Sequence, residues 1–528
     1  MPHQISTAVS VAFQRLRSYS VGCFQIDTRT LAVFRILVGS LILADLLLRS
    51  RNFTFFYAED GVVPRSLALQ RTSDEVFSFY YVSTEPAVTA ALFVVQALIA
   101  LQLVVGYRTR IATILSFLFV VSLDFRNPFV LSYADTLFRL LLFWAIFLPL
   151  GERWSIDAIH ANREPRSAVV NAATAMILLQ MVYMYVVNWH HKRQSDLWTS
   201  GEATPLIMGL DNTTFLLGDL TREFPTLLQY GGLKWYYMLM FAWLLVLLRG
   251  RARMLFVALF LGGHATFAIT VRIGAFPYVA LAGLLLFLQA QFWDDLSTLG
   301  KRLGVSPSRL RPDPHDIERL GRLFPTIHWG IEADRVRAWL YNLILVIVVL
   351  STMTLAVSPF APMNDVVSEE TEDRIDEVAS VGGVSQPEWS VFAPHPRTTD
   401  RYYVFLAETE DGDRYDVYND REFTYDRPHD ELQKQYGTYR ERFYMTSVQS
   451  SNVVASHLAD HICAEWEEER QTNLTHINMY EVTERVTLET IDDPSERSRE
   501  AERFYEHGCG DNPPAVLDED EINLTGES

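Results

Sequence analysis

The sequence predicts a polytopic α-helical membrane protein with about nine transmembrane helices, followed by a C-terminal extracytoplasmic α+β domain. Apolar residues make up 49% of the 528-residue chain, and the long apolar runs are confined to residues 30–357. The charge changes at the same point, from a net +7 over residues 1–357 to a net −26 over residues 358–528. These two observations separate a membrane-embedded part from an acidic part that faces water.

Several of the apolar runs approach the roughly 20 residues that a helix needs to cross the hydrocarbon core. The nine predicted spans are 30–48, 86–105, 111–123, 136–150, 168–189, 232–248, 254–271, 275–291 and 339–357. Residues 1–29 lack the apolar region and cleavage site of a signal peptide, so we expect a cytoplasmic N-terminal segment. Within it, residues 11–24 are mildly amphipathic and suit the inner membrane surface.

The distribution of Lys and Arg between the loops predicts the orientation. With the N-terminus inside, the inner segments hold 19 basic residues and the outer connections hold 9. An odd number of crossings then places the acidic domain outside, in agreement with its charge. We therefore expect a multi-pass protein of the plasma membrane.

The water-soluble part begins with an acidic linker, residues 358–383, which precedes an α+β domain over residues 384–510. Residues 401–419 alternate around Asp411-Gly412, which predicts a β-hairpin. Residues 430–470 have helical spacing, and residues 476–488 alternate like a strand. The tail, residues 511–528, is acidic and is predicted to be disordered.

The excess of carboxylates argues against a nucleic-acid partner, because phosphates would be repelled. A dense carboxylate surface suits a protein of a halophile, since high salt screens its self-repulsion. The chain also has far fewer lysines than arginines. The alternative is an ordinary acidic ectodomain.

Three cysteines are too few for a disulfide framework or a Cys-rich zinc site. Cys463 and Cys509 share the acidic domain and could pair in an oxidising compartment. Four glycosylation sequons fall outside in the predicted topology, at Asn52, Asn212, Asn473 and Asn523. The chain has no phosphate-binding loop, no HExxH and no GxSxG, so neither a metal nor a nucleotide is predicted.

Ionisable residues inside spans are costly and are therefore candidates for a functional site. Arg35 and Asp45 lie in the first span, Arg139 in the fourth and His264 in the seventh. Each has a structural alternative: Arg35 could snorkel to the inner surface, Asp45 could sit near the outer end, and His264 could be a hydrogen-bonded packing residue.

The stretch HHKR, residues 190–193, follows the fifth apolar segment. If a loop covers Lys192, burial favours the neutral amine, which could deprotonate a lipid-soluble phenol or hydroquinone arriving sideways from the bilayer. His190 and His191 could tune this base or relay its proton. The alternative is that all four residues form a solvated cap on the helix.

Four ordered blocks resemble the horizontally transferred transmembrane (HTTM) family, which is related to the vitamin K-dependent gamma-glutamyl carboxylase. The first is IDTRTLAVFRILVGSLILADLL (26–47) and the second is NPFVLSYADTLFRLLLFWAIFLPLGERWSIDA (127–158). The third combines Tyr183 and Tyr185 with Lys192 and the W-x-x-G of Trp198. The fourth is HATFAITVRIGAFPYVALAGLLLF (264–287).

The resemblance implies a transmembrane fold over roughly residues 25–300 and a reduced, menaquinone- or vitamin K-like quinone as cofactor. In the carboxylase, a lysine in the matching block deprotonates the hydroquinone, and the quinone chemistry then removes a γ-proton from glutamate, to which carbon dioxide adds. Lys192 matches that lysine. The pocket would include His264, Tyr183, Tyr185 and Trp198, with Arg35, Asp135 and Arg139 as structural or lining residues.

This chain departs from the family pattern in two ways that weaken the carboxylation prediction. Asn188-Trp189 replaces the glycine usually found before the lysine, and the spacing from the tyrosines to the lysine differs by a residue or two. The chain also lacks the much larger lumenal region of the carboxylase. QPEWSVFAPHP (386–396) resembles an element that follows the last helix in many microbial members, and we expect Trp389 and Phe392 to dock the outer domain on the membrane body.

The sequence thus supports two functions of different classes. The first is the oxygen-dependent oxidation of a reduced quinone, with or without a coupled modification of a peptide or protein on the outer face. The second is a non-catalytic accessory or docking protein, for example in peptide export or maturation. Both have the lipid bilayer as a partner.

Overall fold

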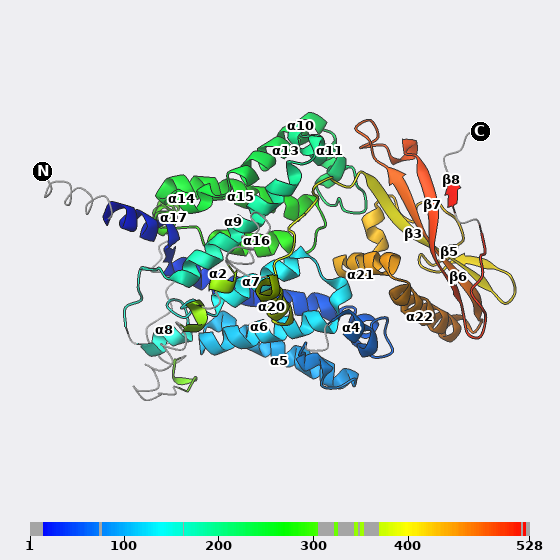
Figure 1. Cartoon of the computed structure of the whole chain (residues 1–528), viewed down its shortest axis with the longest axis horizontal. Coiled ribbons are helices and arrows are strands. Elements are labelled where there is room, and N and C mark those ends of the chain that lie inside the picture. Colours follow the sequence, from blue (N-terminus) through cyan, green and yellow to red (C-terminus); the bar gives the residue numbers. More distant parts are fainter. Residues whose placement is uncertain are drawn as a thin grey trace, which may run out of the picture.

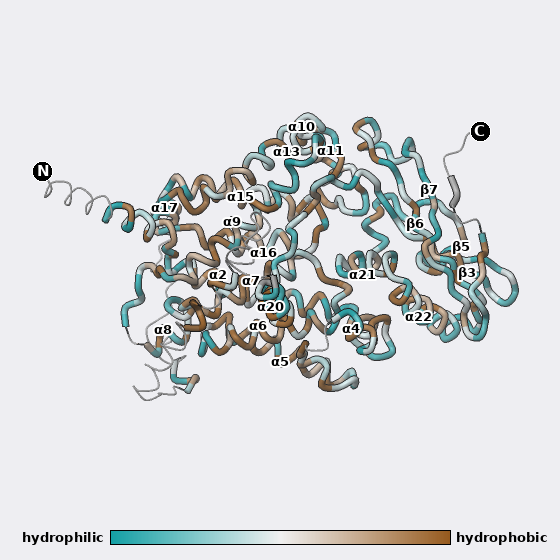
Figure 2. The backbone as a smooth tube through the Cα atoms, in the orientation of Figure 1, coloured by the Kyte–Doolittle hydropathy of each residue, from teal (hydrophilic) through white to brown (hydrophobic). Residues whose placement is uncertain are grey.

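The computed structural model describes residues 14–72, 76–161, 163–304, 321–325, 343–346, 349–352, 369–518 and 521–523. A body of helices occupies one end of the molecule, and a sheet with two covering helices occupies the other (Figure 1). We call these the helical body (α2 to α17) and the C-terminal domain (β3 to β8). Apolar residues dominate the long helices of the body (Figure 2).

Within the described residues, the helical body is built from nine longer helices joined by short elements. The longer helices are α2 (Thr28–Ser50), α5 (Pro86–Val105), α6 (Thr109–Arg126), α7 (Tyr133–Ala145), α9 (Ala172–Lys192), α13 (Pro225–Met240), α15 (Gly250–Thr270), α16 (Phe276–Leu285) and α17 (Ala290–Arg302). The short elements are β1 (Ile26–Asp27), α3 (Phe53–Tyr57), α4 (Arg65–Arg71), η1 (Phe79–Tyr81), η2 (Pro128–Val130), α8 (Ile156–Ala161), β2 (Ala168–Val169), α10 (Asp196–Ser200), α11 (Ala203–Met208), α12 (Gly218–Arg222) and α14 (Leu244–Leu247).

Local sequence signals fix where the site-forming helices begin. Helix α9 starts with a capping box, in which the Asn171 side chain accepts from the Thr174 amide and Thr174 accepts from the Asn171 amide. Ser132 and Asp135 form the same box at the start of α7. These caps satisfy amides that would otherwise lack partners at the helix ends.

Each predicted span up to residue 291 coincides with a helix or a pair of helices, whereas most of 339–357 lies outside the described residues. In the described part of the chain, four helices are long and apolar enough to cross a membrane, namely α2, α5, α9 and α15. The pair α16 and α17 adds a fifth if it counts as one span bent by 97°. The expected number of nine spans therefore stays a prediction.

Three predicted segments differ from the structure in ways that matter for the site. Segment 232–248 is broken into α13 and α14, and segment 275–291 ends at the bend between α16 and α17. The predicted fifth span stops at residue 189, but α9 continues to Lys192. The HHK sequence is therefore the last turn of a helix rather than the start of a loop.

The C-terminal domain is a six-stranded antiparallel sheet in the order β5-β4-β3-β6-β7-β8. Its strands are β3 (Thr399–Thr409), β4 (Arg414–Asp416), β5 (Arg421–Glu422), β6 (Leu474–Arg485), β7 (Arg499–Gly508) and β8 (Glu521–Asn523). Its helices are η4 (Leu432–Gln435), α21 (Tyr439–Ser450), α22 (Asn452–Arg470) and η5 (Pro494–Glu496). The predicted hairpin, helical region and strand are present as β3–β4, α21–α22 and β6.

Two parts of this region have more structure than the sequence predicted. The linker contains helix α20 (Glu369–Val381), and the tail contributes β8, which pairs with β7. The tail is held before that strand as well, because Asn478 accepts from the Leu517 amide and donates to the Ala515 carbonyl. The sheet edge thus orders residues whose composition predicted disorder.

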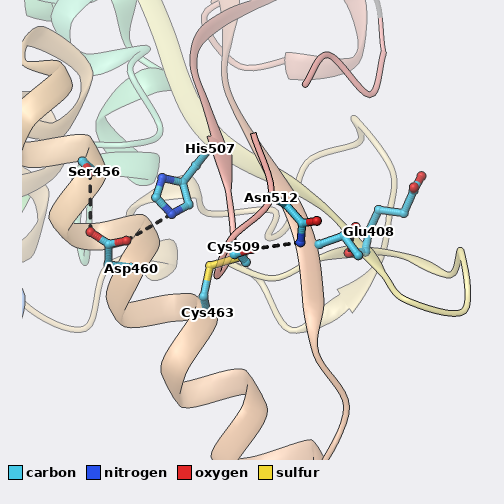
Figure 3. Close-up of a disulfide and its surroundings, with 8 residues drawn as sticks. Glu408, Ser456, Asp460, Cys463, His507, Cys509 and Asn512 are labelled. Atoms are coloured by element: carbon cyan, nitrogen blue, oxygen red, sulfur yellow. Dashed lines mark hydrogen bonds and ion pairs between the residues drawn. A yellow bond between two sulfur atoms is a disulfide. The ribbon is translucent and has the colours of Figure 1, made fainter. Parts of the chain in front are cut away.

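Cys463 on α22 and Cys509 after β7 form a disulfide that ties the helix to the sheet (Figure 3). The predicted glycosylation sites differ in how exposed the structure leaves them. Asn473 is exposed, whereas Asn212 is fully buried and accepts a hydrogen bond from Arg397. Asn212 therefore cannot accept a glycan in the folded protein, which corrects that prediction. Asn52 is half-buried, and the side chain of Asn523 lies outside the described residues.

A buried cluster of charged side chains joins the C-terminal domain to α2, α6 and α7. Arg440 on α21 donates to Asp45 at 2.5 Å and to Asp135 at 2.9 Å. Arg49 pairs with Asp45 and Asp124, both at 2.7 Å. Arg139 lies 3.6 Å from Asp124 and completes a set of three carboxylates and three guanidiniums. Matched charges of this kind allow the ions to be buried together.

A second cluster joins the loop after α11 to the sheet. Asp211, Asp400 and Glu484 are buried with their oxygens close together, and the fully buried Arg497 lies between them. The Arg497 guanidinium is 3.0 Å from Asp211, 3.5 Å from Asp400 and 3.7 Å from Glu484. Arg222 and Arg427 also pair with Asp211. Since guanidiniums already fill the space between these carboxylates, the donor set is that of an ion network rather than of a metal centre.

Removing Arg440 should destabilise the protein through the first cluster. In Arg440→Met, Asp135 stays buried without its shortest ion pair, and we expect a loss of about 3–5 kcal/mol in the free energy of unfolding. Thermal unfolding of the purified protein in detergent measures the effect. The matched control is Arg374→Met, because the Arg374–Glu370 pair is exposed and such pairs contribute little. Equal unfolding temperatures for the two variants would contradict the assigned role.

Glu484 should make the stability depend on pH. Burial raises the pKa of its carboxyl from 4.5 to about 7, so the folded state binds this proton more tightly than the unfolded state. The resulting stabilisation is fully present below about pH 4.5 and is lost as the pH rises through about 7. Glu484→Gln should therefore gain stability relative to the wild type at pH 8, but not at pH 5. Unfolding temperatures at both pH values test this, with the exposed Glu468→Gln as control; a constant difference would refute it.

Candidate functional site

The last two turns of α9 present a row of polar side chains to the interior of the body. Tyr185, Asn188 and Lys192 are spaced so that they share one face of the helix. All three are buried, and Lys192 has only 2% of its surface exposed although it is the terminal residue of the helix. The site therefore lies at the end of a transmembrane helix, where another segment of the chain covers it.

The cover is residues 386–394, which we call the strap, and it leads into the C-terminal domain. Trp389 is fully buried and stacks on Tyr133 with ring centroids 5.8 Å apart. Ser390 and the Tyr133 hydroxyl are 2.8 Å apart. Trp389 and Phe392 both have left-handed backbone conformations, with φ of 50° and 52°. Such conformations are costly for large side chains and tend to occur at functional sites. The strap thus docks through Trp389, as the sequence predicted.

Carbonyl groups of the strap point at the end of α9. Lys192 Nζ donates to the Val391 carbonyl at 2.8 Å and to the Phe392 carbonyl at 3.3 Å. Nζ also lies 3.4 Å from the centroid of the Trp198 ring, on α10. Among the described residues, no carboxylate lies within ion-pair distance of this amine. The amine is therefore surrounded by dipoles and an aromatic face, without a counter-ion.

Lys192 is not needed to hold the strap in place. The Val391 carbonyl also accepts from Asn188 Nδ2 at 3.1 Å, and the Phe392 carbonyl accepts from Trp198 Nε1 at 2.9 Å. Asn188 additionally donates to the Trp389 carbonyl at 2.7 Å. Both carbonyls that contact the lysine would thus keep a donor without it.

Lys192 and Trp198 lie at one end of a cavity of about 550 Å³. The cavity extends between α9, α13, α15 and the strap, and most of its lining is apolar or aromatic. Its deeper polar groups are the Tyr185 hydroxyl and His264 Nε2, which are 2.8 Å apart. His264 is fully buried, and its Nδ1 has no hydrogen-bond partner in the described part of the chain. Trp235, Phe267 and Phe276 surround the imidazole.

The structure brings together only some of the residues predicted for the pocket. Lys192, Tyr185, His264 and Trp198 line the cavity, whereas His190, His191 and Tyr183 do not. The two histidines are half-buried on other faces of the last turn of α9. This follows from the helical geometry, since consecutive residues point in different directions.

The predicted arginines and aspartate lie elsewhere. Arg35 donates to the carbonyls of Leu150, Arg153 and Trp154, and therefore fastens the loop before α8. Asp135 and Arg139 belong to the ion cluster around Arg440. None of these three residues lines the cavity that contains Lys192.

Sequence reasoning missed Asn188, Trp235 and the strap carbonyls. Asn188 was visible only as a departure from the expected glycine, and its side chain proves to be an anchor of the strap. The carbonyl groups of residues 391 and 392 approach Lys192 across about 200 residues of chain. No local pattern indicates such a contact.

Comparison with known proteins identifies the helical part of the chain. The family model for the HTTM domain matches residues 24–293. No curated protein and no solved structure matches the chain. The matched range contains Tyr185, Lys192 and His264, whereas the strap and the C-terminal domain lie beyond it.

Replacing the lysine by an apolar side chain of similar length should leave the fold intact. We expect Lys192→Met to unfold at the same temperature as the wild type or at a higher one, because a buried charge without a counter-ion is costly. Asn188→Leu should unfold at a lower temperature, since it leaves buried strap carbonyls with fewer donors, at about 1–3 kcal/mol. Thermal unfolding in detergent distinguishes the two. A strongly destabilised Lys192→Met would mean that the lysine is a structural residue.

Proposed function

The chain belongs to the HTTM domain family, and from that membership we propose that it is a membrane-embedded enzyme in which Lys192 removes a proton from an acidic, lipid-soluble hydroxyl compound. A reduced quinone is the proposed substrate class. The reaction is an oxygen-dependent oxidation, with or without a coupled modification of a peptide or protein.

The observation that carries this proposal is a buried amine that has no counter-ion among the described residues and is not needed to hold the strap. Burial of an unpaired ammonium is unfavourable, so the neutral amine is favoured and its lone pair can accept a proton. The strap has its own donors in Asn188 and Trp198. Lys192 is costly to bury and is not needed to hold the strap, so we attribute its presence to a catalytic role.

The cavity fits a quinone in size and in chemistry. Its volume of about 550 Å³ falls in the range of roughly 300–1,000 Å³ that small-molecule sites occupy. Aromatic side chains would hold the ring, Lys192 Nζ would meet one hydroxyl group, and the Tyr185–His264 pair offers hydrogen bonding deeper in the cavity. When bound, a reduced quinone would supply the acidic hydroxyl group and the electrons for the oxidation.

The residues of this chain have separate tasks in that scheme. Lys192 accepts the proton at Nζ, and the Val391 and Phe392 carbonyls orient the amine. The strap and Trp198 keep water away from the amine, which strengthens polar interactions inside the cavity. His190 and His191 do not line the cavity, so a proton relay through them has no support from the geometry.

We also propose a plasma-membrane location with the C-terminal domain on the outer side. The disulfide between Cys463 and Cys509 suits an oxidising compartment. Residues 14–24 and α17 lie at the opposite end of the helical body from this domain (Figure 1). The prevalence of Lys and Arg in the predicted inner loops supports the same orientation.

Turnover of a reduced naphthoquinone in proteoliposomes tests the function. We expect Lys192→Met to abolish oxygen-dependent oxidation of the quinol while the protein stays folded, because the base is lost. His190→Ala and His191→Ala are matched controls from the same helical turn and should retain activity. Turnover in Lys192→Met at the wild-type rate would refute the role of Lys192. A wild-type protein that neither oxidises nor retains quinone, but copurifies with a stable partner, would favour the accessory function.

A further inference from the structure

We propose that the cavity opens sideways to the lipid through a portal between α13 and α15, and that this portal holds the hydrocarbon chain of an amphiphilic substrate. The head group of that substrate would reach Lys192, a detail that rests on the proposed function. The portal itself rests on the packing of the two helices. The substrate class is thereby narrowed to compounds with a long apolar chain.

The exposed part of the cavity lining comes from α13 and α15. Leu227, Gly231 and Lys234 on α13 are exposed, and so are Leu259 and Gly262 on α15. Residues that line a cavity and are also exposed on the flank of the body mark its mouth. The opposite wall, formed by Met184 and Tyr185 on α9, is buried.

The two helices are packed mainly against other neighbours. Helix α13 packs on α9, α10 and α11, and α15 packs on α14, α16 and α17. Both lie along one edge of the body, on the side away from α5 (Figure 1). Trp235 bridges the deeper part of the gap, where its ring lies against Gly263 and His264. Helix α12 contacts both helices, whereas Gly231 and Gly262 line the cavity and are exposed.

Gly231 and Gly262 have no steric reason to be glycine. A Cβ atom added at either position would meet no heavy atom within 4 Å. Glycine inside a helix costs about 0.5–1 kcal/mol relative to alanine. Both glycines lie inside helices and face open space at the mouth of the same cavity. Their presence is explained if this space must stay free for a hydrocarbon chain that enters the cavity.

The water side of the cavity is covered, whereas the lipid side is not. The strap seals the end at Lys192 through Trp389, Val391 and Phe392. Lys234 stands at the mouth, and its long side chain can extend to the nearer headgroup layer. An amphiphilic substrate would keep its hydrocarbon chain in the bilayer, while its head group enters the cavity and reaches the covered end at Lys192.

A photolabelling experiment tests the portal without any quinone. The full-length protein is reconstituted in vesicles containing a phosphatidylcholine with a diazirine at the end of one acyl chain. We expect irradiation to label the buried wall of the cavity on α9, around Met184. Gly231→Trp and Gly262→Trp should lose that label, because an indole would fill the mouth. Gly231→Ala and Gly262→Ala should keep it.

Leu98→Trp is the matched control, since Leu98 is exposed on α5, away from the cavity. It should keep the label, and thermal unfolding verifies that each tryptophan variant is folded. Absence of label on α9 in the wild type, or full labelling in folded Gly231→Trp and Gly262→Trp, would overturn the portal. A competing isoprenoid quinone separates the two proposals: labelling that it displaces supports both, whereas labelling that it leaves unchanged keeps the portal and counts against the quinone site.

Discussion

The desolvation of Lys192 is the constraint on which the site depends. An amine at the end of a transmembrane helix would normally extend into water, but the strap closes over this one and leaves it 2% exposed. The strap can do so because its own carbonyls face the helix and have donors in Asn188 and Trp198. The environment of the amine is thus set by a segment that is distant in the sequence.

The strap in turn depends on how the C-terminal domain is attached. Two clusters of buried ions join that domain to the helical body, one around Arg440 and one around Arg497. Because a buried ion left without its partner is costly, displacement of the domain from these partners would be strongly unfavourable. Along the chain, Arg440 and Arg497 both follow the strap, whereas the carboxylates of the helical body with which they pair, Asp45, Asp135 and Asp211, precede it. Because both clusters attach the C-terminal domain to the helical body, the strap that leads into this domain is held in place over Lys192.

The sequence predicted the architecture better than the site. Apolar runs, charge distribution and alternation were sufficient to locate the helices, the hairpin β3–β4 and the strand β6, because these are local patterns. They could not show that α9 extends to Lys192 or that the 232–248 segment is broken. The family blocks identified Lys192, Tyr185, His264 and Trp198 as residues of one pocket, and all four line the same cavity. His190 and His191 were included because they precede Lys192 in the sequence, and Tyr183 because it matches the family's tyrosine-rich helix, but residues close together in a helix point in different directions. The role of Asn188 and the strap carbonyls that face Lys192 were missed because their contacts cross about 200 residues.

The two ends of the cavity differ, because the strap covers the end at Lys192 whereas the proposed portal faces lipid. This difference bears on the chemistry at Lys192. If water reached Nζ, an ammonium would be solvated and would have no reason to give up its proton. If the lipid side were closed as well, an apolar substrate would have to cross the strap, whose Trp389 is fully buried. The proposed arrangement avoids both difficulties, since it joins a covered polar end to a mouth between α13 and α15. In that proposal the base is kept away from water and the substrate travels in the bilayer, and the strap and the two glycines serve these two requirements.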